Sequence, residues 1–481
     1  MAGPGGQRDF LVLRIVLLAV FAGALISRFV NPVFLNDQGE MLVLSQSFQL
    51  VYDEQPPLYA WIAKGLLELT GRHVAALEAF KLIFAITGLY LCGVLAYRVS
   101  HSPAAALLSV AFAMSLPTMG EDALSEATHT VAMIAVSLAS TLLIFRQMQQ
   151  PRRFFWLVLG LVWALGLAFK HTMIMLAVAQ IAALWVARVP ARVELSKQAA
   201  IAALIMLALN AAFFIQLLST SAAIDNGLNE FGMGESTFAF LRGLSDFLSS
   251  ILAEAALLVL TGIYMAVRYK ASIARWYGEM GQEERVLLWS GLIFLAIWAV
   301  SIIITNTSVV RDRWLAPGLV WLCPVWAAAM FRTLGDNGKR WAGRIAIVFI
   351  ALILIARIVD LQASEEPRQA GWQDMASQIS AAYPEPDILL SKHINDAGNL
   401  HLAMNVPVAV ANGYLPPLEQ LPQTVLVMWR DEGGVPPEIT GLLRQASARW
   451  GELECGAMDT QDLTAGGAQT YRRYFMVCER G

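Results

Sequence analysis

The sequence predicts a polytopic α-helical membrane protein with about eleven transmembrane helices and a small soluble α/β domain at its C-terminal end. Of its 481 residues, 57% are hydrophobic and only 15% are charged, and the mean hydropathy is +0.56. Soluble globular domains carry about 25% charged residues, so this composition argues against a cytosolic enzyme. The net charge of −3 gives no extended basic surface, so nucleic acid is not expected as a partner.

Apolar runs predict the membrane spans, because a helix needs about 20 mostly apolar residues to cross the hydrocarbon core of a bilayer. The first run lacks a small-residue cleavage site, so we interpret it as a retained anchor and not as a signal peptide. The third and fifth runs are short. The predicted spans cover residues 10–30, 77–97, 104–116, 128–145, 154–169, 173–187, 199–218, 248–267, 286–305, 314–331 and 345–361.

Lysine and arginine predict the orientation, because they gather in the cytoplasmic loops of membrane proteins. With the N-terminus inside, the inner loops hold sixteen of these residues and the outer loops six. An odd number of spans then places everything after residue 361 on the outer, periplasmic-type side of the membrane. We therefore expect a membrane domain over residues 1–361 and a soluble periplasmic domain over residues 362–481.

The soluble domain is predicted to mix helices and strands. Cys455 and Cys478 fall in its last two strands, where an oxidising compartment favours a disulfide, the alternative being two buried thiols. Cys92 and Cys323 lie inside apolar runs and are expected to be ordinary core residues. Helices are expected over residues 372–382, 396–404 and 437–450, and strands over 388–391, 406–410, 424–429, 452–458 and 471–478.

Acidic residues gather in the predicted outer loops, above all in the first. Asn36 is a good helix cap, and Asp37 and Glu40, three residues apart, would share one face of the helix that it starts. Two prolines at 56–57 then impose an extended break, and Tyr59 suits the membrane interface. This pattern predicts a helix along the membrane surface followed by a sharp turn. The alternative is an acidic, solvated loop with ordinary aromatic anchors.

Three further outer segments bring charged side chains close to the hydrocarbon. Charges so near the bilayer are costly unless they are paired or solvated, so they are candidates for function. Each of them alone is explained equally well as a snorkelling surface charge. The candidates are Glu126 at the start of one span, Lys170 and His171 in a short turn, and Arg311 and Arg313 before a late span.

Carboxylates from two outer loops and cations from two others together predict one kind of chemistry. A carboxylate accepts the proton of an attacking hydroxyl, and cations bind a lipid-linked phosphate as it departs. The pattern favours transfer of a group from a membrane lipid phosphate to an acceptor outside the cytoplasm. One alternative is a transporter or flippase for a lipid-linked sugar, although transporters more often show repeated halves and charges at mid-membrane. Another is a non-catalytic subunit that presents substrate to an enzyme.

At these residues the sequence resembles the glycosyltransferase 39/83-type integral membrane transferases of the GT-C fold, which include protein O-mannosyltransferases and the lipid A aminoarabinose transferase. The specific match is the first-loop signature, residues 36–40 (NDQGE) and 55–61 (QPPLYAW). Residues 123–127 (ALSEA) are similar to an A-L-T-D-A segment, 166–172 (GLAFKHT) to a G-L-x-x-K-Y-T turn, and 313–317 (RWLAP) to an R-Y-x-x-P helix entry. The resemblance covers about the first 330 residues. The soluble domain is similar to those of the family only in its general type.

The resemblance implies a polyprenyl-phosphate-sugar donor and an inverting glycosyltransferase with Asp37 as the general base. Lys170 and Arg313, together with Arg311 and His171, would bind the phosphate of the donor. No cofactor is predicted, and no set of metal ligands is apparent in the sequence, although a divalent metal helps some members of the fold.

The other implied contacts are to sugar hydroxyl groups. Glu126 stands where the family has an aspartate and would orient the substrate or a basic group. Glu40, Glu54 and Tyr59 would contact the donor or the acceptor.

The acceptor implied by the resemblance is lipopolysaccharide, either its core or lipid A, which would receive galacturonic acid or aminoarabinose. Protein O-glycosylation is the alternative. A uronic acid would favour an additional cation near the sugar, such as Arg242 or Arg311, and an aminosugar would favour a carboxylate such as Glu40, Asp53 or Glu54. The similarity of the first loop favours galacturonic acid.

Overall fold

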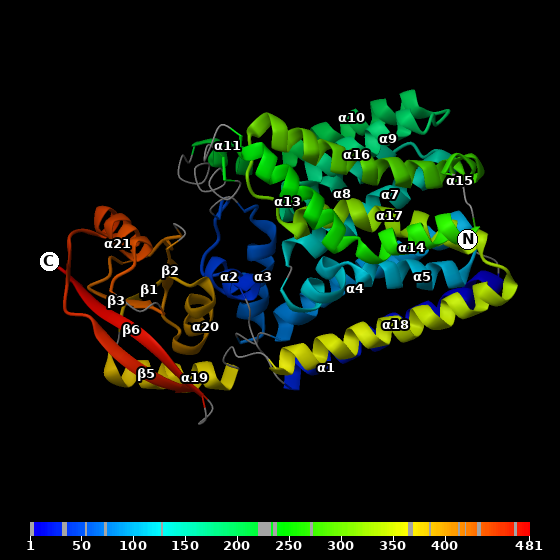
Figure 1. Cartoon of the computed structure of the whole chain (residues 1–481). Helices are drawn as coiled ribbons and strands as arrows, with labels where there is room; N and C mark the ends of the chain where they lie inside the picture. The colour runs from blue at the N-terminus through cyan, green and yellow to red at the C-terminus, as the bar shows by residue number, and fades with distance from the viewer. Residues whose placement is uncertain are drawn as a thin grey trace. The chain divides into compact units, whose positions relative to one another are not determined.

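Apolar helices account for most of the chain up to Ala363, and helices alternate with strands after that residue (Figure 1). The contacts divide the chain into two units. The helical unit comprises Met1–Leu25, Ala79–Ile215 and Gly227–Val359, and the mixed unit comprises Ile26–Glu78, Gln216–Asn226 and Asp360–Gly481. The computed structural model describes residues 4–30, 36–52, 55–71, 75–126, 128–219, 232–233, 238–269, 273–363, 369–383, 386–411, 414–418, 420–430, 434–465 and 469–481.

The helical unit is built from long helices joined by short connections. Gly23 of α1 has a side-chain methyl group of Leu354 only 3.1 Å from the position of its missing Cβ, so α1 and α18 lie side by side (Figure 1). The helices are α1 (Pro4–Val30), α4 (Ala75–Ser100), α5 (Pro103–Ser115), the π-helix η1 (Thr118–Asp122), α6 (Ala123–Ser125), α7 (His129–Gln149), α8 (Phe155–Phe169), α9 (Met173–Val186), α10 (Arg192–Leu209), α11 (Ala211–Ser219), α13 (Ala239–Glu254), α14 (Ala256–Tyr269), α15 (Ile273–Glu279), α16 (Gln282–Thr305), α17 (Asp312–Thr333) and α18 (Asp336–Ala363).

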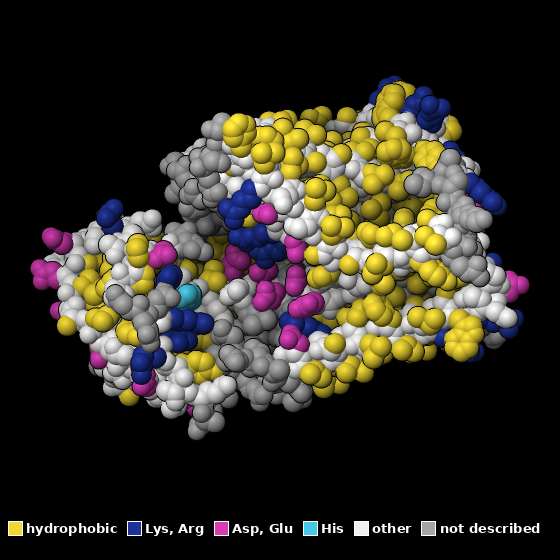
Figure 2. Space-filling model, viewed as in Figure 1, with side chains coloured by type: hydrophobic (Ala, Val, Ile, Leu, Met, Phe, Trp, Pro, Cys, Tyr) yellow, Lys and Arg dark blue, Asp and Glu magenta, His cyan; other side chains and the backbone are white. Residues whose placement is uncertain are grey.

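Each apolar run predicted from the sequence consists mostly of helical residues. Over the described residues, five helices are long and apolar enough to cross a membrane, and up to seven spans result if each of two bent helix pairs counts as one. Four shorter apolar helices accompany them. Large hydrophobic side chains such as Leu204, Ile263 and Val348 are exposed, and Figure 2 shows hydrophobic atoms covering the middle of the visible face of this unit. The protein is a multi-pass membrane protein.

Two runs that the sequence presents as single spans are bent in the structure. The run 199–218 breaks between α10 and α11 with an angle of 56°, and the run 248–267 breaks between α13 and α14 with an angle of 73°. At the first break, the side-chain amide of Asn210 donates to the carbonyl oxygen of Met206 at 2.9 Å, where a backbone N–H would otherwise bind. Mean hydropathy averages over the whole run and so does not reveal where a side-chain amide competes with a backbone N–H group.

Ion pairs join helix ends at one side of the helical unit. Arg98, near the end of α4, binds Glu283 at the start of α16, with nitrogen–oxygen distances of 2.6 and 2.8 Å. Arg332, near the end of α17, binds Glu284 at 2.6 and 2.9 Å. Both arginines were assigned from the sequence to the same, inner side of the membrane, and the structure brings their helix ends together.

The mixed unit contains the predicted soluble α/β domain. Its strand order is β2-β1-β3-β6-β4, with β5 paired to β6. The strands β1 and β3 and the helix α21 have the predicted bounds, whereas β5 was missed. The elements are α19 (Gln369–Ala382), β1 (Ile388–Ser391), α20 (Ile394–Met404), β2 (Val408–Val410), β3 (Thr424–Trp429), α21 (Pro437–Trp450), β4 (Leu453–Cys455), β5 (Asp459–Ala465) and β6 (Gln469–Arg480).

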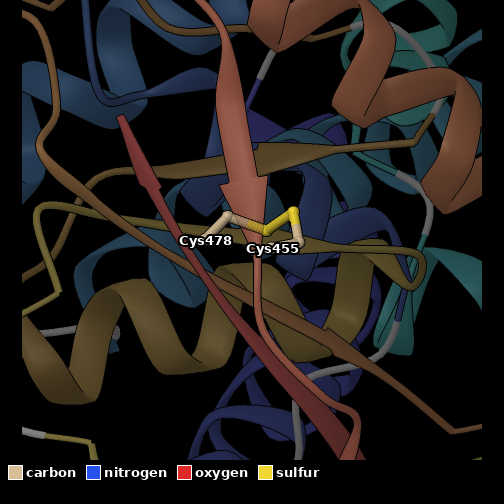
Figure 3. The surroundings of a disulfide bond; sticks show 2 residues. All are labelled: Cys455 and Cys478. Carbon is tan, nitrogen blue, oxygen red and sulfur yellow. A yellow bond between two sulfur atoms is a disulfide. The ribbon is translucent and has the colours of Figure 1, made fainter. Parts of the chain in front are cut away.

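A disulfide joins the paired strands β4 and β6. Cys455 of β4 lies opposite Cys478 of β6 in the antiparallel register, and the two sulfur atoms are bonded (Figure 3). The disulfide alternative of the sequence analysis is therefore confirmed. Cys92 and Cys323 are free and buried, as expected of core residues.

The first outer loop also belongs to the mixed unit. Helix α2 (Asn36–Leu44) packs against α20, and α3 (Leu58–Leu69) packs against α2. The side-chain amide of Gln46 binds the backbone of Val408 on the edge strand β2, donating to its oxygen at 3.0 Å and accepting from its nitrogen at 2.7 Å. The hydroxyl groups of Ser47 and Tyr414 lie 3.4 Å apart. Residues expected in the membrane domain are thus held by the C-terminal domain.

Candidate functional site

Helix α2 carries the predicted base at its N-terminal end. Asp37 lies in the first turn, where the helix dipole and the unbonded backbone N–H groups favour a negative side chain. Its side chain is half-buried, as is that of Glu40. The first-loop helix is present as predicted, its placement along a membrane surface stays a prediction, and Asp37 is partly exposed.

A buried phenol lies close to Asp37. Tyr59 of α3 is only 2% exposed. Burial raises the pKa of Tyr59 well above its usual value, and the nearby negative charges of Glu78 and Asp37 raise it further. The phenol therefore stays neutral at physiological pH and keeps a hydroxyl group that can donate a hydrogen bond.

Glu78 is a site residue that the sequence analysis did not find. It is 3% exposed, and one of its oxygens accepts a hydrogen bond from the side-chain amide of Gln38 at 3.2 Å. Gln38 follows Asp37 directly, so Glu78 fixes the start of the helix that carries the predicted base. Lys81 lies three residues further along α4 and is 1% exposed. The available signal was an acidic and a basic residue inside a predicted span, a pattern that marks functional positions in membrane proteins.

The turn between α8 and α9 is held against the start of α7 in the helical unit. The ammonium group of Lys170, 9% exposed, donates to the hydroxyl of Thr130 at 2.7 Å. The Nδ1 atom of His129 lies 3.1 Å from the carbonyl oxygen of Phe169, and this oxygen accepts the hydrogen bond. The second and third outer segments therefore meet, with Lys170 at their contact.

Glu254 and Arg357 hold the segment that leads to Glu126. Glu254, 1% exposed at the end of α13, accepts hydrogen bonds from the backbone nitrogen of Thr118 at 3.1 Å and from its hydroxyl at 2.6 Å. Arg357 of α18 pairs with Glu121 at 3.3 Å. These contacts fix both ends of the π-helix η1 and so restrict where the half-buried Glu126 lies.

The two predicted arginines lie at the N-terminus of α17. Arg311 is exposed and stacks over the ring of Trp314, with 5.8 Å between its guanidinium carbon and the ring centroid. Arg313 is half-buried. Between them, Asp312 accepts a hydrogen bond from Ser250 of α13. This anchors the start of α17 and leaves a cationic side chain on either side of the anchor.

The predicted residues divide between the two units. In the described part of the chain, no group of three or more His, Cys, Asp and Glu side chains has the arrangement of a metal site. Asp53 and Glu54 lie outside the described residues. The mixed unit holds Asp37, Glu40 and Tyr59, and the helical unit holds Glu126, Lys170, His171, Arg311 and Arg313.

Comparisons with known proteins agree with this architecture. Residues 54–216 match the family described as dolichyl-phosphate-mannose-protein mannosyltransferase. The chain is 27% identical over 454 residues to the lipopolysaccharide core galacturonosyltransferase RgtA of Rhizobium johnstonii, covering 88% of this chain and 87% of that protein. It is 26% identical over 457 residues to RgtB of the same organism, with 91% of each chain covered.

The fold is shared with a solved membrane enzyme. The crystal structure of ArnT from Cupriavidus metallidurans bound to undecaprenyl phosphate superposes with a TM-score of 0.65 at 13% identity, covering 97% of this chain and 98% of that one. The fold and these similarities define the class of protein: the chain is an integral-membrane glycosyltransferase with the GT-C fold.

Proposed function

We propose that the protein transfers galacturonic acid from a polyprenyl-phosphate donor to a hydroxyl group of lipopolysaccharide, in its core or in lipid A. Two relatives that align with 88% and 91% of the chain are named lipopolysaccharide core galacturonosyltransferases. The solved structure with the same fold contains undecaprenyl phosphate, a polyprenyl phosphate. Eleven crossings with the N-terminus inside would give the outer loops and the C-terminal domain a periplasmic location.

Asp37 is the general base in this proposal. The observation that carries it is the position of the carboxylate in the first turn of α2, half-buried and beside the neutral phenol of Tyr59. A general base must reach the proton that it removes, and a partly open carboxylate at a helix N-terminus meets that need. Glu78 acts as a positioning residue through Gln38.

The reaction is a single displacement. The acceptor oxygen attacks the anomeric carbon on the face opposite the phosphate, and its proton passes to the Asp37 carboxylate. The new C–O bond forms as the bond to the phosphate oxygen breaks, and the electron pair leaves with the polyprenyl phosphate. The configuration at the anomeric carbon is inverted.

Cations stabilise the leaving phosphate as its charge develops. Lys170 and Arg313 have this role in the proposal, with support from His171 and Arg311. Arg311 is exposed and also suits the carboxylate of a uronic acid, because a guanidinium group binds carboxylates with two hydrogen bonds. Glu126 orients the sugar.

The test compares lipopolysaccharide from cells that lack the gene with that from complemented cells. Intact mass spectra of lipid A and core are expected to lose the mass of one uronic acid, which wild-type protein restores and Asp37→Asn does not. In purified protein, Asp37→Asn is expected to lower turnover by about 10²–10⁴-fold, as is typical of a lost general base. Asp462→Asn, at a half-exposed site on β5, is the matched control and should behave as wild type.

The flippase and the substrate-presenting subunit considered in the sequence analysis predict other outcomes. A flippase would change the sidedness of the lipid-linked sugar, and purified protein would not form a glycosidic bond. A substrate-presenting subunit would tolerate Asp37→Asn. Lys170→Ala and Arg313→Ala are expected to raise the KM for the donor, which a protein without a donor site would not show.

A further inference from the structure

A partly open cavity of about 320 Å³ lies within the mixed unit, and Asp37 is not among its lining residues. It is bounded by the end of α2, by α3 and by the residues that follow α20. Its polar lining includes Ser47, Lys64, Glu68, His401 and Asn405, and most of the remaining wall is proline and leucine. A volume of this size is typical of a site for a small organic ligand.

The walls of the cavity are fixed by hydrogen bonds. The side chain of Gln46, which also lines the cavity, is bound to both backbone groups of Val408 on the edge strand β2. The ammonium group of Lys64 donates to the backbone oxygen of Gln46 at 3.2 Å and pairs with Glu68 at 2.8 Å. The Gln46–Val408 hydrogen bonds thus join loop and domain beside the cavity, and the Lys64 contacts order its loop side.

The polar groups of the lining include both donors and acceptors. His401 uses Nδ1 to donate to the carbonyl oxygen of Val406 at 2.8 Å, because that oxygen only accepts. In the neutral ring, Nε2 is then the acceptor atom. Asn405 adds an amide, which both donates and accepts. It ends α20 in the left-handed conformation, with φ of 58°.

This lining fits a neutral sugar better than an anion. The positive charge of Lys64 is offset by Glu68, so the cavity has no excess of cations to attract a phosphate or a carboxylate. Sugar hydroxyl groups both donate and accept hydrogen bonds, and the C–H faces of a sugar ring pack on apolar surface. The mixed polar lining and the proline and leucine wall match these two properties.

The cavity lies at a useful distance from the proposed base. Asp37 is at the N-terminal end of α2, and Ser45, a lining residue, follows its C-terminal end. They are eight positions apart along the chain, a length of about 12 Å at a helical rise of 1.5 Å per residue. A sugar in the cavity would therefore be separated by a short oligosaccharide from a hydroxyl group that reacts at Asp37.

Apolar side chains beside the cavity suit a lipid-anchored glycan. Phe48 is 61% exposed and lies under the ammonium group of Lys64, 5.4 Å from it, and Leu69, next to Glu68, is 86% exposed. Exposed apolar groups at the edge of a loop are favoured at a membrane surface. A glycan attached to a lipid would be presented at that surface.

We propose that this cavity binds a neutral sugar of the acceptor glycan, at a distance from the hydroxyl group that is glycosylated. The proposal rests on the proposed function, because it takes the acceptor to be a lipopolysaccharide glycan. The cavity would select acceptors that carry this second sugar, so it is a specificity site and not part of the reaction centre.

The test uses two substitutions that remove polar groups and leave the hydrogen bonds of Gln46 with Val408 and of Lys64 with Gln46 in place. Asn405→Gly removes the amide while allowing the positive φ, and Glu68→Ala removes a largely exposed carboxylate. The double variant of the full-length protein is compared with wild type and with the surface control Asp462→Ala. We expect the KM for purified lipopolysaccharide to rise at least tenfold, with the KM for the donor and the melting temperature unchanged. An unchanged KM for lipopolysaccharide would overturn the proposal.

A binding measurement separates this proposal from the proposed function. Titration calorimetry uses a core oligosaccharide that lacks uronic acid, released from lipopolysaccharide by mild acid. We expect wild-type protein to bind it and the double variant to bind at least tenfold more weakly. This result would support the cavity even if no sugar transfer were detected. Transfer by wild-type protein with equal oligosaccharide binding by both proteins would retain the function and refute the cavity.

Discussion

Replacing Gly398 with alanine is expected to push α2 away from α20 and to displace the proposed base. The two helices cross at a pair of glycines. A Cβ atom on Gly398 would lie 2.3 Å from the backbone oxygen of Gly39, and one on Gly39 would lie 2.8 Å from the Cα of Asn395. Both obstacles are backbone atoms, so a change of side-chain rotamer cannot relieve the overlap.

The size of the effect follows from this geometry. Ordinary contact begins at 3.4 Å, so the 2.3 Å gap at Gly398 must open by about 1.1 Å. Overpacking of this kind costs about 1–3 kcal/mol of folding free energy. Asp37 lies two residues before Gly39 and would move with it. A displacement of about 1 Å at a reacting group lowers the rate on the order of 10²-fold.

Melting temperature and turnover of the purified protein measure the two effects. Gly441→Ala is the matched control, because Gly441 lies on α21 with nothing within 4 Å of its missing Cβ. An added methyl group there should leave turnover unchanged and stabilise the helix by up to about 1 kcal/mol. If Gly398→Ala melted and turned over like wild type, the close crossing of α2 and α20 would be refuted.

Three further predictions concern stability. The double variant Cys455→Ala/Cys478→Ala removes a disulfide between residues 23 positions apart and should lower the free energy of unfolding by about 3 kcal/mol. A reductant should lower the melting temperature of wild type and leave that of the variant unchanged. Asp396 of α20 is fully buried and pairs with Arg430 and Arg473; Asp396→Asn should cost about 3–5 kcal/mol, because it leaves buried positive charge uncompensated. Burial raises the pKa of Asp396, but the hydrogen bond and the charges of the arginines that bind it outweigh burial, so its pKa is lowered below the usual 3.8. Its contribution to folding stability is therefore present above pH 3.8 and is lost as the pH falls through the lowered pKa. Acid unfolding of wild type and variant would measure this loss. Thr118→Val should cost about 1–3 kcal/mol by removing a donor from buried Glu254, and Thr118→Ser should restore the melting temperature.

Local patterns predicted the soluble elements well. The strand Thr424–Trp429 is a continuous apolar run, and the helix Pro437–Trp450 begins at a proline and ends before Gly451, signals that act within a few residues. Strand β5 (Asp459–Ala465) was missed because most of its side chains are exposed and polar. It forms through its pairing with β6, which the sequence of β5 alone does not reveal.

The candidate site was predicted in part, for a similar reason. Asp37 and Tyr59 lie in a short motif with recognisable helix and turn residues, so a local pattern was enough to select them. Glu78 lies in an apolar run, where hydropathy averages over a single charge. Its importance comes from its contact with Gln38, forty residues away, and only the folded chain brings the two together.

The contacts of the predicted first outer loop would give the C-terminal domain a role in the proposed reaction. Gly39 meets α20 without room for a side chain, and Gln46 binds the edge of the sheet through both atoms of its amide. One contact lies near the middle of α2 and the other two residues beyond its C-terminal end, so both the position and the direction of the helix are set by the C-terminal domain. Since Asp37 lies on that helix, the domain acts as the support of the proposed base. Its own stability, through the disulfide and the buried Asp396, then determines how accurately that base is held.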